Sequence, residues 1–307
     1  MNAVPPRRRI LVAGASGLIG SALVAAARSA GHDVIRLVRR LPEASDEVAW
    51  NPAEGVLDPG ALAGVDAIVN LAGENIAAGR WTGARRRRIL FSRLDATRTL
   101  VDAIRRMPRR PAVLVNASAV GFYGARGDEV LGETSARGAG FLPDVCQAWE
   151  RRAAEAGRFH VRTVWIRFGL VLARQGGALA RLRPLFACGL GGPLGDGRQW
   201  TGWIAEADAA GAILHAIADE HCAGPVNAVA PELVTNAALA ATLARLLHRP
   251  ARLPAPAWAL RLAFGRMMAD EALLASARVI PERLLAAGFA FRHPGLEGAL
   301  RAALEIS

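Results

Sequence analysis

The sequence of 307 residues contains no lysine, so arginine occupies all 38 of its Lys and Arg positions. It has one tyrosine, Tyr123, and only three cysteines. Cys146, Cys188 and Cys222 are odd in number, far apart and without metal-ligand spacing, which argues against disulfides and a zinc site. We expect them to be buried thiols.

Long apolar runs are also missing. Although 52% of the residues are hydrophobic, no run approaches the roughly 18 residues needed to span a bilayer, which indicates a soluble globular protein with no membrane partner. The basic start MNAVPPRRRI leads into a glycine-rich turn instead of an apolar stretch with a cleavage site, so it does not resemble a signal peptide. We expect a cytoplasmic location.

The formal net charge is +11, and its densest cluster is Arg85–Arg88. Aromatic residues make up only 6% of the chain and are not interleaved with the arginines, and no recognition motif is visible. A solvated helix face is therefore favoured over nucleic-acid binding, which would have to be steeply salt-dependent.

Short apolar runs alternate with longer amphipathic stretches along the first half of the chain. Strands that are apolar throughout are typical of a parallel sheet covered on both faces. The order predicts an α/β fold, a Rossmann doubly wound parallel sheet. The expected strands are 9–15, 33–38, 65–73, 111–118 and 161–169, and the expected helices are 18–30, 84–106 and 143–156.

From about residue 175 the character changes to a smaller, mostly helical substrate region. Glycine and proline crowd 189–200, and helical patterns occupy 206–220 and 236–248. The stretch 250–256 resembles a hinge, and 257–305 is expected to be helical with a break near 288–295.

Three glycines, Gly14, Gly17 and Gly20, directly follow the first strand and open a helix. The first permits a tight turn, the second lets the backbone approach a pyrophosphate, and the third lets helix and strand pack closely. The helix N-terminus supplies free N–H groups for the anion. This predicts a dinucleotide site contacted also by Ser16, Leu18 and Ile19.

The choice of cofactor depends on the end of the second strand. NAD enzymes usually place an acid there for the ribose 2′-hydroxyl, whereas this chain has Arg39 and Arg40. A guanidinium binds a 2′-phosphate bidentately, so NADP(H) is preferred over NAD(H). The alternative is that both arginines merely face water.

Several motifs are spread over nearly the whole chain: GASGLIG, DAIVNLAGENI, SRLDATR, NASAVGFYG, RFGLVLARQGGAL, GLGGPLGDGRQW and GPVNAVAPELVTN. Together they make the sequence similar to the atypical extended short-chain dehydrogenases/reductases called epimerase family proteins. The resemblance implies an NAD(P)-binding domain over 1–235, with substrate-region insertions from about 175, and a small DUF1731-like domain over 251–298.

The same resemblance implies further cofactor contacts. Arg39, Leu71, Ala72 and Arg93 would touch the dinucleotide, and the backbone of Leu71–Gly73 would pass under it. Ala117 and Ser118, at the end of the fourth strand, complete the expected cofactor contacts.

Extended reductases of this superfamily use a Tyr-x-x-x-Lys pair, in which lysine lowers the tyrosine pKa and holds the nicotinamide ribose. Without lysine, this chain cannot form that pair. Its helix at the corresponding place has Phe141 or Leu142 near the tyrosine position and Val145 or Cys146 near the lysine position. Cys146 is a weak candidate nucleophile, because no histidine is suggestively placed.

Three residues remain as catalytic candidates. Ser118 could hydrogen-bond a substrate carbonyl and Tyr123 could donate the proton, or the two could simply cap the strand and pack the pocket wall. Glu74, just past the third strand, could act as a base, bind substrate or cap a turn.

The segment 189–203 is expected at the rim of the substrate pocket. Arg198 could meet an anionic group, and Trp200 and Trp203 could stack on a ring; a structural loop is the alternative. Relatives have a histidine in a W-I-H motif where this chain has Ala205, so that residue's role does not transfer.

Two functions stay open. The first is an NADP(H)-dependent oxidoreductase or epimerase-like enzyme acting on an unidentified small molecule. The alternative is an NADP(H)-binding sensor or regulator without turnover. The chain is expected to be a monomer or a homodimer.

Overall fold

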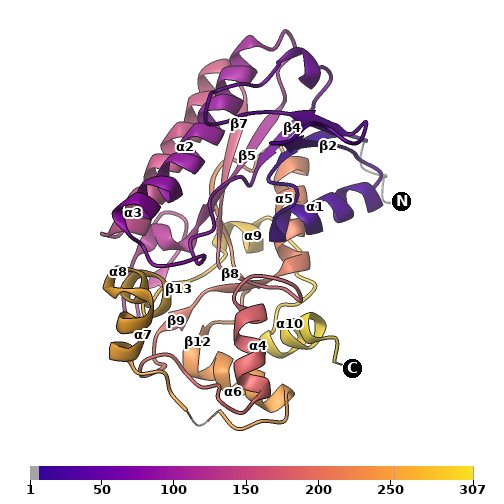
Figure 1. Cartoon of the computed structure of the whole chain (residues 1–307). Helices are drawn as coiled ribbons and strands as arrows, with labels where there is room; N and C mark the ends of the chain where they lie inside the picture. Colours follow the sequence, from indigo (N-terminus) through magenta and orange to yellow (C-terminus); the bar gives the residue numbers. More distant parts are fainter. Residues whose placement is uncertain (1–6, 252, 307) are drawn as a thin grey trace.

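The chain is built around a seven-stranded parallel sheet, seen in a computed structural model that describes residues 7–251 and 253–306 (Figure 1). The strand order is β11-β7-β5-β4-β1-β2-β3. The doubly wound Rossmann fold is therefore confirmed. The strands are β1 (Arg9–Ala13), β2 (Asp33–Val38), β3 (Glu47–Ala49), β4 (Ala67–Asn70), β5 (Val113–Ala119), β7 (Arg162–Phe168) and β11 (Gly224–Ala228).

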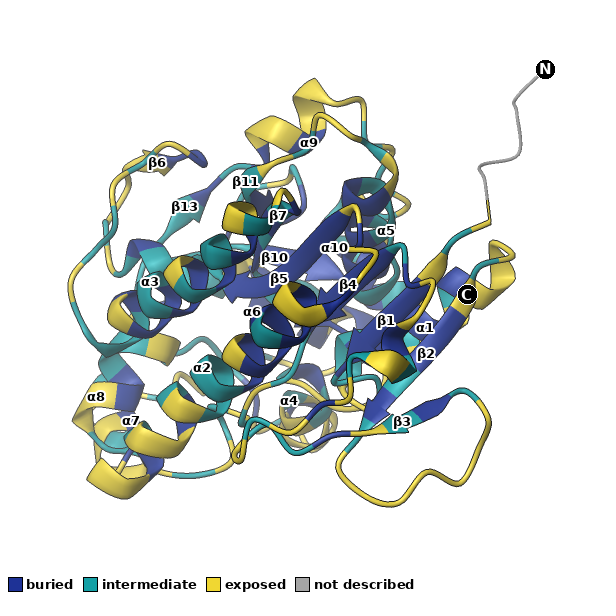
Figure 2. Ribbon diagram, turned by 90° about the horizontal axis from the view of Figure 1, so that it is seen from above, coloured by how far each residue is buried: buried dark blue, intermediate teal, exposed yellow. Residues whose placement is uncertain are grey.

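Helices cover both faces of this sheet. On one face lie α2 (Gly83–Arg106) and α3 (Phe141–Ala154), and on the other α1 (Leu18–Ser29) and α5 (Glu206–Ala218) (Figure 1). Two apolar clusters result, one on each face, and the strands between them are buried (Figure 2). Covering both faces explains why the strands are apolar throughout instead of alternating.

Two strands of the sheet are not predicted by the sequence pattern. β3 follows β2 through a loop without a crossover helix, and β11 has the sequence GPVNA, in which Gly, Pro and Asn are poor strand formers. β11 forms because it pairs in register with β7, from Gly224 against Val164 to Ala228 against Phe168. Tertiary pairing overrides local propensity here.

Beyond the carboxyl ends of the strands, shorter elements form a second layer of structure (Figure 1). Part of this layer packs around a separate cluster that includes Trp203, Leu243 and Leu300. The remaining elements of the described chain are β6 (Val130–Leu131), β8 (Leu170–Leu172), α4 (Leu179–Ala187), β9 (Trp200–Thr201), β10 (Trp203–Ala205), β12 (Val234–Thr235), α6 (Asn236–Leu246), α7 (Ala257–Phe264), α8 (Arg266–Met268), β13 (Arg278–Val279), α9 (Glu282–Ala286) and α10 (Leu296–Leu304), with short helical turns at Gly60–Leu62, Val120–Tyr123, Glu155–Phe159 and Ala269–Leu273. Of these, α9 and the turns at Gly60–Leu62 and Glu155–Phe159 pack into the two cores of the main sheet.

The C-terminal stretch is more broken than expected. Instead of one helical segment interrupted near 288–295, it contains four short helices, a π-helical turn and β13. β13 pairs in parallel with β6, through Arg278 against Val130 and Val279 against Leu131. This pairing ties the C-terminal segment to the loop that follows β5.

Within the described residues, no helix is both long and apolar enough to cross a membrane. The first six residues of the N-terminal stretch, to which the signal-peptide expectation applies, lie outside that part of the chain.

The buried face of α2 generates a stability prediction. Leu100 is fully buried against the sheet, whereas Phe91 on the same helix is 50% exposed. We expect Leu100→Ala to lower the free energy of unfolding by about 2–5 kcal/mol, because it removes transfer energy and leaves a cavity. Phe91→Ala should cost about 0.5 kcal/mol or less. Urea denaturation measures both, and equal losses would contradict this packing of α2.

Candidate cofactor and substrate site

The glycine turn brings β1, α1 and the end of β4 into close contact. Gly14 has a φ of +81°, and a Cβ there would lie 2.8 Å from the carbonyl carbon of Leu71. A Cβ on Gly20 would lie 2.1 Å from the Gly14 carbonyl oxygen. Larger residues at either place would force helix and strand apart, so the turn requires glycine at both.

The amino end of α1 is suited to an anion. The helix begins after Gly17, and within the described residues no side chain caps its first turn. Ser16 and Gly17 are exposed, and Leu18 and Ile19 are half-buried. The free N–H groups and the helix dipole therefore face outward at the carboxyl edge of the sheet, where parallel α/β sheets bind ligands.

The backbone of Leu71–Gly73 lies beside this turn. It is held by a buried amide, since Asn70 Oδ1 accepts from the Ala72 N–H at 3.2 Å. The Asn70 amide nitrogen in turn donates to Thr97 Oγ1 at 2.9 Å and to Asn116 Oδ1 at 2.7 Å. Three neighbouring elements, β4, α2 and β5, are thus fixed to one another directly below the expected dinucleotide.

Arg93 reaches the same place from α2. Its Nη1 donates to the carbonyl oxygens of Glu74, at 3.1 Å, and Ile89, at 2.9 Å. The guanidinium carbon lies 5.0 Å from the Trp149 ring centroid, and a Cβ on Gly73 would meet it at 3.1 Å. Burial lowers the pKa of Arg93, yet a guanidinium stays charged. The structure thus places a fixed cation beside Gly73.

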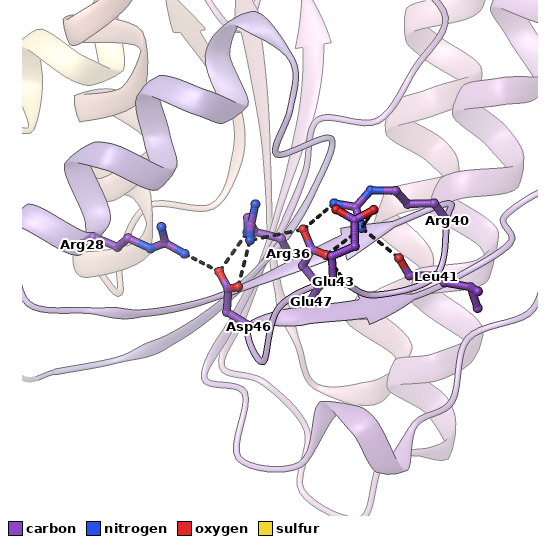
Figure 3. A network of polar contacts seen from close by, with 7 residues as sticks. All are labelled: Arg28, Arg36, Arg40, Leu41, Glu43, Asp46 and Glu47. Atoms are coloured by element: carbon purple, nitrogen blue, oxygen red, sulfur yellow. Dashed lines mark hydrogen bonds and ion pairs between the residues drawn. The ribbon is translucent and has the colours of Figure 1, made fainter.

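Arg39 and Arg40, at the end of β2, have different surroundings. Arg39 is exposed and makes no hydrogen bond or ion pair with any described residue. Arg40 is held by Glu47, with Nη2 to Oε1 at 2.8 Å and Nη1 to Oε2 at 2.9 Å (Figure 3). Of the two arginines, Arg39 is the one whose whole guanidinium is free to meet a phosphate.

Ser118 lies at the end of β5 and is 4% exposed. Its hydroxyl donates to Glu150 Oε1 at 2.6 Å. Glu150 is in turn held by Arg167, from Nε to Oε1 and from Nη2 to Oε2, both at 2.8 Å. Because the Ser118 proton is committed to Glu150, the oxygen offers a lone pair and suits a substrate donor. Donating to a substrate carbonyl would require the hydroxyl to turn away from Glu150.

Tyr123 is fully buried and is not arranged as a proton donor to a substrate. Its hydroxyl donates to Asn227 Oδ1 at 2.7 Å and accepts from Arg167 Nη1 at 2.9 Å. Burial raises the pKa of Tyr123, although Arg167 and Asn227 act in the opposite direction. The geometry therefore favours the alternative for Tyr123, a packed wall residue.

The helix α3 lies at the place expected for the Tyr-x-x-x-Lys pair, which this chain lacks. It presents Cys146 to the end of β5. The thiol lies 3.7 Å from the Ala119 carbonyl oxygen and is 3% exposed. Burial, together with the Glu150 carboxylate, raises the pKa of Cys146 to about 11. A thiol with so little thiolate is a poor nucleophile. Our expectation of three buried thiols is wrong for the other two, since Cys188 is exposed and Cys222 is half-buried.

Glu74 and the arginine cluster contact each other. The Glu74 carboxylate lies 3.3 Å from Arg85 Nη1, and Arg85 Nη2 donates to the Asn75 carbonyl oxygen at 2.6 Å. Arg85 is also buried, so it does not belong to a solvated helix face, whereas Arg87 and Arg88 are exposed. Glu74 is therefore paired with a cation and is not a free carboxylate in this arrangement.

The expected rim residues divide into three environments. Arg198 is exposed, and no described residue binds its guanidinium. The Trp200 indole N–H donates to Asp128 Oδ1 at 2.7 Å, and Arg278 lies 4.6 Å from the ring centroid. Trp203 is fully buried in the core, so it is not available to stack on a ligand.

Sequence reasoning missed the buried polar residues that organise this edge of the sheet. The strongest missed signal is Arg167, a charged residue inside an otherwise apolar strand, which must find a buried partner. The partner, Glu150, lies on the same helix as Cys146. The other missed residues are Glu47, Asn70, Thr97, Asn116, Glu133 and Asn227, together with Trp149, whose indole N–H donates to Thr97 Oγ1 at 3.0 Å.

Comparison with known proteins places this site in a family. Residues 10–141 match the NAD dependent epimerase/dehydratase family, and residues 255–303 match the domain of unknown function DUF1731. An epimerase family protein of Mycobacterium bovis is 46% identical over 95% of this chain and 96% of its own length. The chain belongs to the epimerase family proteins.

Two solved structures are similar to the chain over 97% of its length. One is a crystal structure of the human epimerase family protein SDR39U1 with NADPH, with a TM-score of 0.88 and 35% identity over 99% of that chain. The other is a nucleoside-diphosphate sugar epimerase of Corynebacterium glutamicum, with a TM-score of 0.80 and 34% identity over 58% of that chain. The recognised resemblance is confirmed.

The three cysteines generate a reactivity prediction. At pH 8 a thiol with a pKa of about 11 is roughly 0.1% thiolate, so Cys146 should react slowest with iodoacetamide. Exposed Cys188 should react first, and half-buried Cys222, whose pKa is raised by burial, should be intermediate. Timed alkylation followed by peptide mass spectrometry gives the order. Early labelling of Cys146 would restore it as a candidate nucleophile.

Proposed function

We propose that this epimerase family protein binds NADP(H) at the carboxyl edge of its sheet and acts on a small molecule as an oxidoreductase or epimerase-like enzyme. The observation that carries the cofactor choice is Arg39, an exposed guanidinium at the end of β2 with no acidic partner among the described residues. The human relative whose crystal structure holds NADPH supports the same choice.

The chain's own residues fit a dinucleotide. The uncapped first turn of α1 would hold the pyrophosphate, and Gly14 keeps the backbone close enough for it. Arg39 would hold the 2′-phosphate, and Arg93, fixed beside Gly73, would contact the cofactor from α2. When bound, the nicotinamide supplies or accepts a hydride.

The role of Ser118 follows from its hydrogen bond. With its proton committed to Glu150, Ser118 would accept a hydrogen bond from a substrate hydroxyl and orient it. Arg198, exposed at the rim, would attract an anionic part of the substrate.

Two contacts support the alternative, an NADP(H)-binding sensor without turnover. Tyr123 is buried and hydrogen-bonded, and Glu74 is paired with Arg85. Neither is arranged as a free acid or base. Such a protein would use cofactor binding itself as the signal.

The cofactor proposal predicts a selective effect of Arg39→Ala. The variant should bind NADPH about 10- to 100-fold more weakly, because one charge-assisted phosphate contact is lost. NADH affinity should stay within about twofold. Isothermal titration calorimetry measures both.

The matched control is Arg105→Ala, which removes one exposed charge from the last turn of α2. It should change neither affinity. Equal weakening of NADPH and NADH by Arg39→Ala would contradict a 2′-phosphate contact.

The two functions are separated by turnover. An enzyme should change the 340 nm absorbance of NADPH or NADP⁺ with at least one of a panel of sugars, ketones and lactones. Ser118→Ala should then slow that change while leaving NADPH binding intact. Tight binding with no absorbance change across the panel would instead support the sensor.

A further inference from the structure

We propose that Glu47 is a positioning residue for cofactor choice, which holds Arg40 so that a free edge of its guanidinium is ready for the 2′-phosphate of NADP(H). The inference rests on the proposed function and adds the residue that prepares Arg40, the second arginine predicted to meet the phosphate.

The hydrogen bonds of Arg40 leave one edge of the guanidinium open. Nη1 donates to Glu47 Oε2 at 2.9 Å and to the Leu41 carbonyl oxygen at 2.8 Å, and Nη2 donates to Glu47 Oε1 at 2.8 Å (Figure 3). Nη1 also lies 3.4 Å from a Glu43 carboxylate oxygen. A guanidinium has five N–H donors. The Nε–H and the second Nη2–H have no partner among the described residues.

That open edge has the right geometry for two oxygens of one anion. The same network contains an example, since Arg36 uses its Nε and Nη2 to hold both oxygens of Asp46, each at 2.8 Å (Figure 3). Bidentate pairing of this kind also suits phosphate. Arg40 can therefore keep its bond to Glu47 and bind a phosphate at the same time.

Glu47 is well suited to hold the arginine still. It is the first residue of β3 and pairs in register with Arg36 of β2, so the sheet fixes its backbone. Its side chain is 2% exposed, and it accepts from the Glu43 N–H at 2.8 Å. That backbone bond and the Arg40 guanidinium lower the pKa of Glu47, so the carboxylate stays ionised at neutral pH.

Holding Arg40 in advance affects binding through entropy. A free arginine side chain loses rotamer freedom when it is ordered by a ligand, a cost of roughly 0.5–1.5 kcal/mol. Arg40 is already held by Glu47 and the Leu41 carbonyl oxygen, whereas no described residue holds the Arg39 side chain. Arg36 Nη2 also lies 3.2 Å from Glu47 Oε1. The negative charge of the Glu47 carboxylate is therefore shared between Arg36 and Arg40, which reduces its repulsion of a nearby phosphate.

The test measures NADPH, NADH and adenosine 2′,5′-bisphosphate binding to the full chain by calorimetry. Glu47→Gln should weaken NADPH and the bisphosphate about 3- to 10-fold, and NADH less than twofold. The matched control is Asp46→Asn. In the wild-type protein, Asp46 binds Arg36 and Arg28 in the same network but does not bind Arg40. The control variant should leave the ratio of NADPH to NADH affinity unchanged.

Two further variants separate positioning from folding of the loop. Arg40→Lys alters an exposed side chain and keeps its positive charge, but it removes the planar guanidinium that can bind a phosphate through two N–H groups. It should also weaken the binding of NADPH selectively. In an Arg40→Ala background, Glu47→Gln should have no additional effect on NADPH affinity.

Four results would overturn the inference. They are tighter NADPH binding by Glu47→Gln, the same weakening in the Arg40→Ala background, an equal effect of Asp46→Asn, and a wild-type protein that binds neither NADPH nor the bisphosphate. The last result alone would also overturn the proposed function.

Discussion

The close approach of the glycine turn to the end of β4 is the contact from which the rest of the site is arranged. Gly14 lies against the Leu71 carbonyl, and Gly20 against the Gly14 carbonyl, so α1 starts directly above the sheet. Its free N–H groups then face the carboxyl edge. Because the neighbouring strand β2 runs parallel to β1, Arg39 and Arg40 follow its end at the same carboxyl edge of the sheet as this anion site.

Two arginine–glutamate pairs have different roles because their solvent exposure differs. Arg167 and Glu150 are both almost fully buried, and their charges offset each other while holding Ser118 and Tyr123 in place. Loss of either partner would leave an uncompensated buried charge. Arg40 and Glu47 pair at the surface, with the carboxylate buried and the arginine 48% exposed. That asymmetry leaves the cation available to a ligand.

The absence of lysine restricts the chemistry that this edge can perform. A lysine can change its pKa and lose its proton, whereas a guanidinium stays protonated and acts as a fixed charge and donor. Arg93 and Arg167 therefore position other groups but do not transfer protons. Two of the titratable groups nearby, Tyr123 and Glu74, are each engaged by an arginine.

The fold was largely predictable because its signals are local. Apolar strands, the spacing of three glycines and the amphipathic pattern of α2 depend on neighbouring residues alone. β3 and β11 were not predictable, since each is stabilised by pairing with a strand already in the sheet. The short elements after residue 250 depend on similar long-range contacts, such as β13 with β6.

By itself the sequence determined the Rossmann fold, the glycine turn, the two arginines after β2 and the impossibility of a Tyr-x-x-x-Lys pair. Only the tertiary structure decided which of these side chains are free. Arg39 and Arg40 are adjacent in sequence, but Arg39 has no partner in the part of the chain that the structure describes, whereas Arg40 is held by Glu47. Tyr123 is buried although its motif lies at the strand ends. The reason is physical: whether a polar group can act on a ligand depends on its hydrogen-bond partners, and those partners come from distant parts of the chain.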